Sequence, residues 1–352
     1  MNRKSEHQIP MGPSADTSRD RQALESMQPS AVRRQMLIGA GAAAALASAP
    51  VLHAQGSGFP SRAVTLMVPF PPGAATDAIA RALAIPLAKH LGQQVIVENR
   101  AGASGTLTTQ AVAQSNATDG HTVAIAPATI FRVPHLQKVP YDPMKDITYI
   151  MNFSGYTFSL VVTPDSPYKT FAEFVAFAKA NPGKVMVGAS GSGSTGHIAT
   201  FTLAKAIGAD ITFVPFKGGA EVLAAFKGGH INAVIDGGWA QIEKTGGGRV
   251  LVTFGEKRIG RLPDIPTARD AGFEIVSRSP IGLVGPRNME ARAVKGWHDA
   301  MKASLADPDY RKLLALHDLE DAYLTGEDFR RLGERLWVDE KKNFEAIGMK
   351  TV

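Results

Sequence analysis

The stretch AVTLMVPFPPGAATD, residues 63–77, decides the fold class of this chain. It begins with a short apolar run at 63–68, which predicts a buried strand, and continues through a proline- and glycine-rich turn at 69–73. A helical pattern then runs over residues 76–91. Because a strand that leads through a tight loop into a helix is the repeating unit of α/β proteins, we expect a sheet flanked by helices.

The same alternation continues along most of the chain, with apolar strand patterns followed by helical patterns. Strands are expected at 95–97, 122–126, 158–163, 185–189, 211–215, 231–235 and 250–254, and helices at 105–115, 170–180, 195–207 and 220–226. Residues 289–347 differ, because they are mostly helical and charged.

Two sets of such units predict a two-lobed fold like that of periplasmic binding proteins, with a ligand cleft between the lobes. Each lobe is expected to be a mostly parallel sheet flanked by helices. We place lobe 1 at residues 59–158 and 284–352 and lobe 2 at residues 159–283. The chain is expected to cross between them at 158–163 and 281–286.

The first 54 residues are interpreted as an export segment. Arg33-Arg34 precedes an uncharged, alanine-rich run at 38–52, which is shorter than the roughly 20 residues of a membrane-spanning helix. Paired arginines before such a run are typical of twin-arginine signals, and Ala54 offers a small residue for cleavage. An ordinary secretory signal is the alternative. Translation from Met27 instead of Met1 would give a compact signal.

Composition excludes several kinds of site and partner. The chain has 352 residues and no cysteine, which excludes disulfides, thiolate nucleophiles and Cys-ligated metals. Its net charge of +6 falls to +4 without the first 54 residues, because they hold six Lys and Arg against four Asp and Glu. No basic run with interleaved aromatic residues follows, so we expect no nucleic-acid partner. The nine histidines are scattered and no H-E-x-x-H occurs, so we expect no metal.

Three unusual loops lie where a predicted strand ends and a helix begins, at 69–77, 126–129 and 190–197. Ligands of open α/β sheets bind at these strand ends. The free N–H groups and partial positive charge of a helix N-terminus hold an anion without an arginine, and glycine lets the backbone approach closely. Lys217-Gly218 and Asp236 follow two further strands and are candidates for the same cleft. The loops therefore predict an anion site.

A dinucleotide site is one enzymatic interpretation of the loop at 190–197. Gly191, Gly193 and Gly196 fit G-x-G-x-x-G between a strand and a helix, which is the context that the dinucleotide fingerprint requires. The fingerprint also places an acidic residue at the end of the next strand, where this chain has Lys217. This interpretation stays open, with a weaker basis than the anion site.

A hydrolase is the second enzymatic interpretation. Ser192 or Ser194, with His197 and Asp236, supplies the residue types of a catalytic triad. No G-x-S-x-G nucleophile elbow occurs in the chain, however, and the spacing places no acid behind the imidazole. Helix capping and packing are the simpler roles for these side chains. An exported α/β enzyme that uses this loop therefore stays the alternative function.

Several motifs occur in a fixed order along the chain. They are PFPPG at 69–73 with Asp77 and Arg81, ENRAGASG at 98–105, DGHT at 119–122, GSGS at 191–194 with His197, VPFKG at 214–218 and LPDIPT at 262–267. In combination they resemble the substrate-binding proteins of tripartite tricarboxylate transporters, the Bug-type receptors. The resemblance covers roughly 59–350. It implies a periplasmic, non-enzymatic receptor without a cofactor, whose lobes close on a small carboxylate and deliver it to membrane transporter subunits. We expect a monomer.

The resemblance also implies ligand contacts made largely by backbone N–H groups, hydroxyls and ordered water. Carried over to this sequence, the expected ligand-binding residues are Phe70, Gly73, Ala74, Asp77, Ala126, Thr129, Ser190, Ser192, Ser194, Thr195, His197, Lys217, Gly218 and Asp236. Ala74 stands where the family usually has a second glycine, and Phe216 and His121 stand where tyrosine is common. These departures leave open which di- or tricarboxylate, amino acid or aromatic acid is bound.

Overall fold

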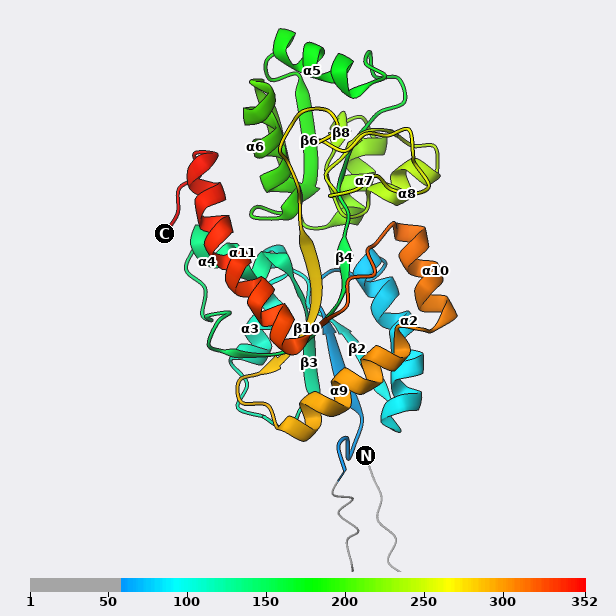
Figure 1. The fold of residues 1–352 in the computed structure, drawn as a ribbon, viewed down its shortest axis with the longest axis vertical. Coiled ribbons are helices and arrows are strands. Elements are labelled where there is room, and N and C mark those ends of the chain that lie inside the picture. The colour runs from blue at the N-terminus through cyan, green and yellow to red at the C-terminus, as the bar shows by residue number, and fades with distance from the viewer. Residues whose placement is uncertain (1–57) are drawn as a thin grey trace, which may run out of the picture. The chain divides into compact units, whose positions relative to one another are not determined.

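Two β-sheets with flanking helices make up residues 58–352, the part of the chain that the computed structural model describes (Figure 1). The predicted α/β class is thereby confirmed. The predicted export segment, with Met27 and Ala54, lies outside the described residues.

The first sheet has strands from both ends of the described chain. It contains β1 (Val64–Val68), β2 (Val95–Asn99), β3 (Thr122–Pro127), β4 (Ile147–Tyr156), β10 (Ser279–Pro286) and β11 (Leu324–Thr325). Their order is β11-β4-β10-β3-β1-β2. β1 is parallel to β2 and β3, whereas β10 is antiparallel to β3 and β4, and β11 is antiparallel to β4.

The second sheet comes from the middle of the chain. It contains β5 (Ser159–Val162), β6 (Val185–Ser190), β7 (Ile211–Phe216), β8 (Ala233–Val234) and β9 (Arg249–Thr253), in the order β7-β6-β8-β5-β9. β6 is parallel to β7 and β8, but β5 is antiparallel to β8 and β9. Both sheets are therefore mixed, not mostly parallel as the alternation predicted. The reason is that β10 and β5, the strands next to the crossings, are antiparallel to their neighbours, whereas the strands of the strand–helix–strand units are parallel to one another.

The chain passes between the sheets twice (Figure 1). It leaves the first sheet at the end of β4, and β5 begins only three residues later, at Ser159. It returns after β9 and enters the first sheet at Ser279, where β10 begins. β10 pairs with β4 along its whole length, so residues 279–283, which we assigned to lobe 2, belong to the first sheet. The lobe limits as such stay a prediction.

Helices cover both sheets. Those beside the first sheet are α2 (Ala75–Leu91), α3 (Leu107–Ala113), α4 (Val133–Leu136), α9 (Ala291–Ser304), α10 (Pro308–His317) and α11 (Gly326–Ala346), with the 3₁₀ turns η1 (Ala103–Gly105) and η2 (Ala128–Phe131). Those beside the second sheet are α5 (Phe171–Ala180), α6 (Thr195–Ile207), α7 (Gly219–Lys227) and α8 (Trp239–Lys244).

Local signals in the sequence account for where the long helices begin and end. Thr170 and Glu173 form a capping box at the start of α5. The Ser194 side chain accepts a hydrogen bond from the His197 N–H at the start of α6. Both α2 and α6 end at a glycine with left-handed backbone, which any other residue adopts only at a cost.

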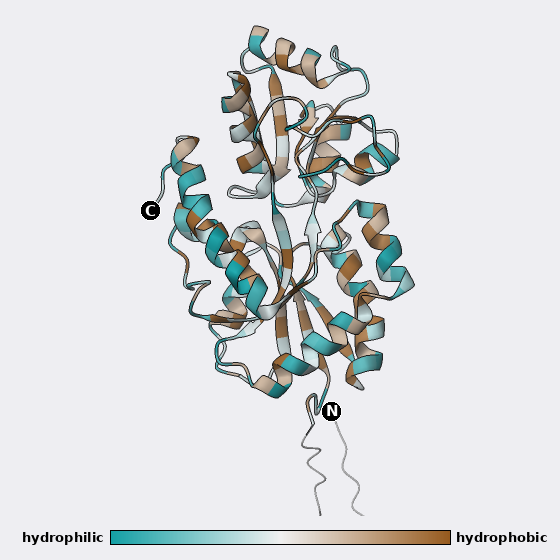
Figure 2. Ribbon diagram, viewed as in Figure 1, coloured by the Kyte–Doolittle hydropathy of each residue, from teal (hydrophilic) through white to brown (hydrophobic). Residues whose placement is uncertain are grey.

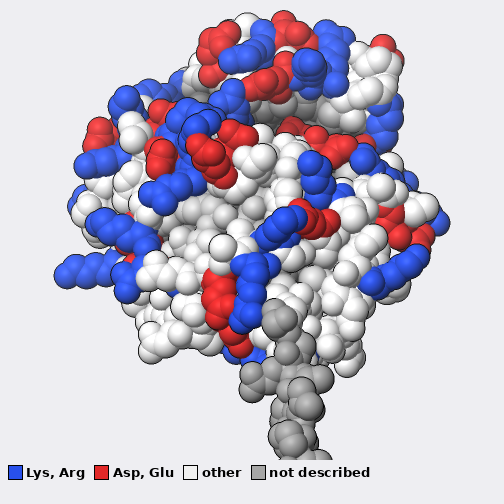
Figure 3. Space-filling model, turned by 60° about the horizontal axis from the view of Figure 1, so that its bottom comes forward, with Lys and Arg blue, Asp and Glu red and all other residues white. Residues whose placement is uncertain are grey.

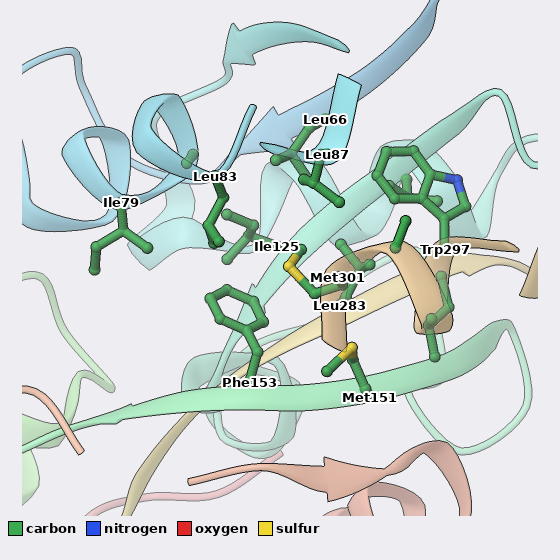
Figure 4. Packing of buried hydrophobic residues seen from close by; sticks show 14 of the residues in the cluster. Leu66, Ile79, Leu83, Leu87, Ile125, Met151, Phe153, Leu283, Trp297 and Met301 are labelled. Carbon is green, nitrogen blue, oxygen red and sulfur yellow. The ribbon is translucent and has the colours of Figure 1, made fainter. Parts of the chain in front are cut away.

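The main core lies between the first sheet and the helices α2 and α9 (Figure 4). Brown strands and partly teal helices in Figure 2 show the same division between apolar interior and polar exterior. Burial of each large side chain stabilises the fold by about 1.5–3 kcal/mol. Fully buried members of this core include Leu66, Ile79, Leu83, Leu87, Ile125, Met151, Phe153, Leu283, Trp297 and Met301.

On the face shown in Figure 3, Lys and Arg side chains are interspersed with Asp and Glu. Among the described residues many such side chains form ion pairs, for example Lys295 with Asp299 and Arg331 with Glu327, each four residues apart on a helix. Within residues 58–352, no helix combines the length and the apolar character that crossing a membrane requires.

Candidate functional site

A cavity of about 230 Å³ lies where strands of both sheets end. The loops after β1, β3, β6, β7 and β8 all contribute to its wall, together with the crossing strands. This is the position at which open α/β sheets bind ligands. Its volume lies just below the ~300–1,000 Å³ of sites for drug-sized molecules, so the cavity suits a smaller ligand.

The structure brings eight of the fourteen expected ligand-binding residues to the wall of this cavity. They are Phe70, Gly73, Ala74, Thr129, Ser190, Ser194, Thr195 and Asp236. The other six lie outside the lining: Asp77, Ala126, Ser192, His197, Lys217 and Gly218. Of these six, Asp77 and His197 hold a loop of the site in place from behind.

Three helix N-termini meet at the cavity. Ala75 begins α2, Thr195 begins α6 and Gly219 begins α7, and all three residues line the wall. The N-termini of α2 and α7 have no side-chain cap. Each N-terminus carries unsatisfied N–H groups and a partial positive charge that favour an anion. Among residues 58–352, no Lys or Arg side chain lines this cavity. Attraction of an anion to this wall therefore depends on the backbone N–H groups.

Asp77 braces the loop after β1. Its Oδ2 accepts hydrogen bonds from the Gly73 N–H at 2.9 Å and from Arg81 Nε at 3.1 Å, and its Oδ1 accepts from Asn99 Nδ2 at 2.8 Å. Burial alone would raise the pKa of this carboxyl, but the hydrogen bonds and the charge of Arg81 hold the pKa below its usual value. Asp77 is thus an ionised support for Gly73, although we expected it among the ligand-binding residues.

Asp236 plays a similar part for the loops after β6 and β8. Its Oδ2 accepts from the Ser190 N–H at 2.9 Å and from Ser190 Oγ at 2.6 Å, while its Oδ1 accepts from the Gly238 N–H at 3.1 Å. These hydrogen bonds occupy both oxygens and join two lining loops. Asp236 therefore lines the cavity, one of the two roles that we considered for it, whereas the helix that follows it, α8 (Trp239–Lys244), has no side-chain cap.

His197 is buried and supports the loop at 190–197. Its Nδ1 accepts a hydrogen bond from the Gly193 N–H at 2.9 Å, and its ring packs 4.2 Å from Phe213 between centroids. Burial lowers the pKa of the imidazole to about 4, so the ring is neutral at pH 7. Because Nδ1 accepts this bond, the neutral ring carries its proton on Nε2, and Asp236 is occupied elsewhere. The triad geometry does not form.

Glycines of the 190–197 loop allow other parts of the protein to pack closely against its backbone. A Cβ on Gly196 would lie 1.9 Å from the carbonyl oxygen of Ile235, so only glycine lets α6 approach β8 this closely. Gly191 lies against Ser104 with a left-handed backbone. The G-x-G-x-x-G spacing is thus accounted for by contacts within the protein.

Lys217 and Gly218 lie at the rim. The Lys217 side chain is exposed, and its backbone N–H donates to Glu221 Oε2 at 3.0 Å. Gly218 is buried against Pro71, which belongs to the loop after β1. The expected cation therefore does not reach the wall, whereas the following Gly219 and Ala220 do.

One hydrogen bond joins the two sides beside the cavity. Ser104 Oγ donates to the Ser192 carbonyl at 2.7 Å, which links a loop beside the first sheet to a loop beside the second, whereas the hydrogen-bonded hydroxyls of Thr76 and Tyr156 both belong to the first-sheet side. Ser192 is exposed, so its part in the site is this backbone contact. The two sides thus meet beside the cavity, which stays partly open to solvent.

The hydroxyl of Thr129 makes no hydrogen bond within the described residues. The residue is 5% exposed, it lines the cavity, and its Oγ1 has no hydrogen-bond partner among the described residues. A buried hydroxyl without a partner is unfavourable. The side chain is therefore well placed to bind a ligand atom.

Several lining residues were missed by the sequence analysis. Tyr156, Phe158 and Ser279 belong to the crossing between the sheets, whose strand β4 the strand–helix alternation did not predict. Gln241 and His317 come from α8 and α10. No local motif marks these positions, because they reach the cavity only through the packing of distant segments.

No group of three or more His, Asp or Glu side chains within residues 58–352 is arranged to hold a metal ion.

Comparison with known proteins places this site in a receptor family. The model of the TctC family, described as "Tripartite tricarboxylate transporter family receptor", matches residues 79–349. A Cupriavidus necator protein, "UPF0065 protein in gbd 5'region", is 40% identical over 322 residues, which cover 90% of this chain and 98% of that protein.

Two solved structures are similar to this chain in fold. "R. palustris Rpa4515 with adipate" is 29% identical, covers 83% of this chain and 99% of its own, and has a TM-score of 0.78. "MatC (Rpa3494) from Rhodopseudomonas palustris with bound malate" is 28% identical, covers 81% and 99% of the two chains, and has a TM-score of 0.74.

Proposed function

Because the chain belongs to the tripartite tricarboxylate transporter receptor family, we propose that it is a periplasmic receptor that captures one small carboxylate. The observation that carries this proposal is the meeting of three helix N-termini at one cavity without a lysine or arginine in its wall. Such a wall binds an anion through backbone N–H groups and hydroxyls. The adipate and malate named with two solved relatives support the carboxylate class.

The hydrogen bond from Ser104 to the Ser192 carbonyl, which joins the two sides beside the cavity, supports capture by lobe closure. A ligand held between the loops of both sheets favours the state in which these loops meet, because it binds that state better. Delivery to the membrane subunits of a tripartite tricarboxylate transporter follows from the family's role. We propose that the receptor acts as a monomer and without a cofactor.

Export belongs to the same proposal. The paired arginines at 33–34 direct the chain through the twin-arginine route, with cleavage after Ala54. N-terminal sequencing of the protein recovered from the periplasm is expected to begin at Gln55. Replacing both arginines with lysine should keep the precursor inside the cell; unimpeded export of that variant would favour an ordinary secretory signal.

The experiment that tests the carboxylate proposal is a thermal-shift screen of mono-, di- and tricarboxylates, amino acids and aromatic acids, followed by calorimetry of the hits. A ligand that binds the folded state raises its melting temperature with concentration. We expect at least one acid to shift the melting temperature and to be recovered unchanged. The corresponding primary amides serve as controls, because they keep the shape and lose the negative charge. If no acid shifts it, the proposal fails.

The exported enzyme is tested with the same protein. Turnover of ester substrates, or a change in NADH or NADPH absorbance with the bound acid, would favour it. The geometry of His197 and Asp236 gives that alternative no further support.

A further inference from the structure

One end of the cavity wall comes from α7, α8 and α10, which lie on one side of the crossing strands in Figure 1 together with α2, whereas α4 and α6 lie on the other side. The side chains at this end are mostly apolar and include Val222, Leu223 and Ile242. A ligand whose carboxylate sits at the N-terminus of α6 therefore extends an apolar part towards α10.

His317 is the polar exception at this apolar end. It is the last residue of α10, lines the cavity and is only 7% exposed. Neither ring nitrogen has a hydrogen-bond partner among residues 58–352, although His135, which is buried to a similar extent, bonds the Trp337 carbonyl at 3.0 Å. Because the protein supplies no partner, an imidazole nitrogen at the cavity wall is free to hydrogen-bond a ligand.

The charges around His317 are balanced. Lys244 on α8 contacts Asp318 at 3.2 Å, Asp318 accepts from Arg261 at 2.7 Å, and Arg261 contacts Glu243 at 2.7 Å. Two cations and two anions thus neutralise one another beside this end. A ligand group placed here meets no excess charge, so its recognition depends on hydrogen bonding.

The protonation state of His317 agrees with that role. Burial lowers the pKa of the imidazole, the charge of Lys244 lowers it further, and the charge of Asp318 offsets part of the change. The neutral ring has one N–H donor and one free nitrogen acceptor.

We infer that His317 determines the specificity of this receptor by hydrogen-bonding a polar group at the far end of an elongated carboxylate. The ligand class is a straight-chain acid with an apolar middle and a terminal carboxylate or hydroxyl. This inference rests on the proposed carboxylate receptor and adds the chemistry of the ligand's second end.

The test compares acids that differ only at that end. Calorimetry is carried out with straight-chain acids of four to eight carbons, each as the dicarboxylate, the ω-hydroxy acid and the simple monocarboxylate. The wild-type protein is expected to bind a dicarboxylate or an ω-hydroxy acid roughly tenfold more tightly than the monocarboxylate of equal length. That ratio corresponds to one hydrogen bond to an otherwise unpaired group.

The variant His317→Leu should lose this preference and keep its affinity for the monocarboxylate within about twofold. His317→Gln, which retains an N–H donor, should recover part of the preference, a readout that a merely structural role would not produce. Thermal melts of both variants show whether they are folded.

An equal loss of affinity for all three kinds of acid, or no loss, would overturn the role of His317 and leave the receptor proposal standing. Wild-type protein that binds the monocarboxylate as tightly as the other two would also overturn it. Failure of every acid to bind the wild type would instead contradict the receptor proposal itself.

Discussion

The Arg132 side chain reaches Glu340 on α11, and Arg132 Nε donates to Glu340 Oε1 at 2.7 Å with both residues less than 5% exposed. The same guanidinium donates to Thr195 Oγ1 at the start of α6 and to the Arg278 carbonyl at 3.2 Å, just before β10. One buried cation thus links helices beside the two sheets, next to the cavity. It is close to the site without lining it.

Breaking this ion pair is expected to be costly. Arg132→Leu leaves Glu340 buried without its cation, which should lower the free energy of unfolding by about 3–5 kcal/mol. The double variant Arg132→Leu/Glu340→Leu removes both charges and should recover a large part of that loss. Urea denaturation of the two variants and the wild type measures both effects. A double variant less stable than the single one would contradict this account.

His197 should make the fold sensitive to acid. Its pKa falls from about 6.5 in the unfolded chain to about 4 in the fold, so in this interval only the unfolded chain takes up the proton. The contribution to stability is complete above pH 6.5, decreases as the pH falls and is gone below pH 4, a loss of up to about 3 kcal/mol. His197→Asn keeps an acceptor near the Gly193 N–H but does not titrate.

The measurement is the free energy of unfolding at several pH values between 4 and 7 for the wild type and for His197→Asn. The difference between them isolates His197, because the other titrating groups are common to both. Parallel curves would show that the imidazole is not held neutral.

The hydroxyl of Thr129 should contribute to binding and not to folding. Thr129→Val replaces an unpartnered buried hydroxyl by a methyl group of similar size, so stability should stay the same or rise by about 1 kcal/mol. Carboxylate affinity should fall roughly fivefold. Thr109→Val is the matched control, because Thr109 Oγ1 is also buried without a partner but lies outside the cavity wall. Equal affinities of the two variants would exclude Thr129 from the site.

Substitution of Ser192 and of Ser194, two of the three serines in the loop at 190–197, should have different effects on stability and binding. Ser194 caps α6 and lines the cavity, so Ser194→Ala should lower stability by about 1 kcal/mol and weaken carboxylate binding as well. Ser192 is exposed and uses only its carbonyl, so Ser192→Ala should change neither quantity by more than about 0.5 kcal/mol. Calorimetry and denaturation of both variants check this; a binding loss with Ser192→Ala would place its hydroxyl at the ligand.

Most elements could be predicted from the sequence because their signals are local. The strand expected at 63–68 is β1 (Val64–Val68), and the helix expected at 195–207 coincides with α6. A capping serine and a terminal glycine act within a few residues of the helix that they limit. Strand β4, in contrast, lies outside any strand–helix unit and was not predicted.

The candidate site could be predicted in part for the same reason. Loops that follow strands were expected at the cavity, and Gly73, Thr129 and Ser194 lie there. Which face of each loop meets the cavity could not be predicted, as the positions of Ser192 and Lys217 show. That choice depends on hydrogen bonds to residues far away in the chain, such as Ser104 with Ser192.

By itself, the sequence determined the α/β class, the loops at the strand ends and the likeness to a receptor family, because periodicity, capping and motif order are local properties. Only the tertiary structure decided that the sheets are mixed, that Arg132 is paired with Glu340, and that His317 from the C-terminal helices lines the same cavity as Thr129. The physical reason is that these contacts form when the chain returns through β10 and packs α10 and α11 against elements more than a hundred residues earlier.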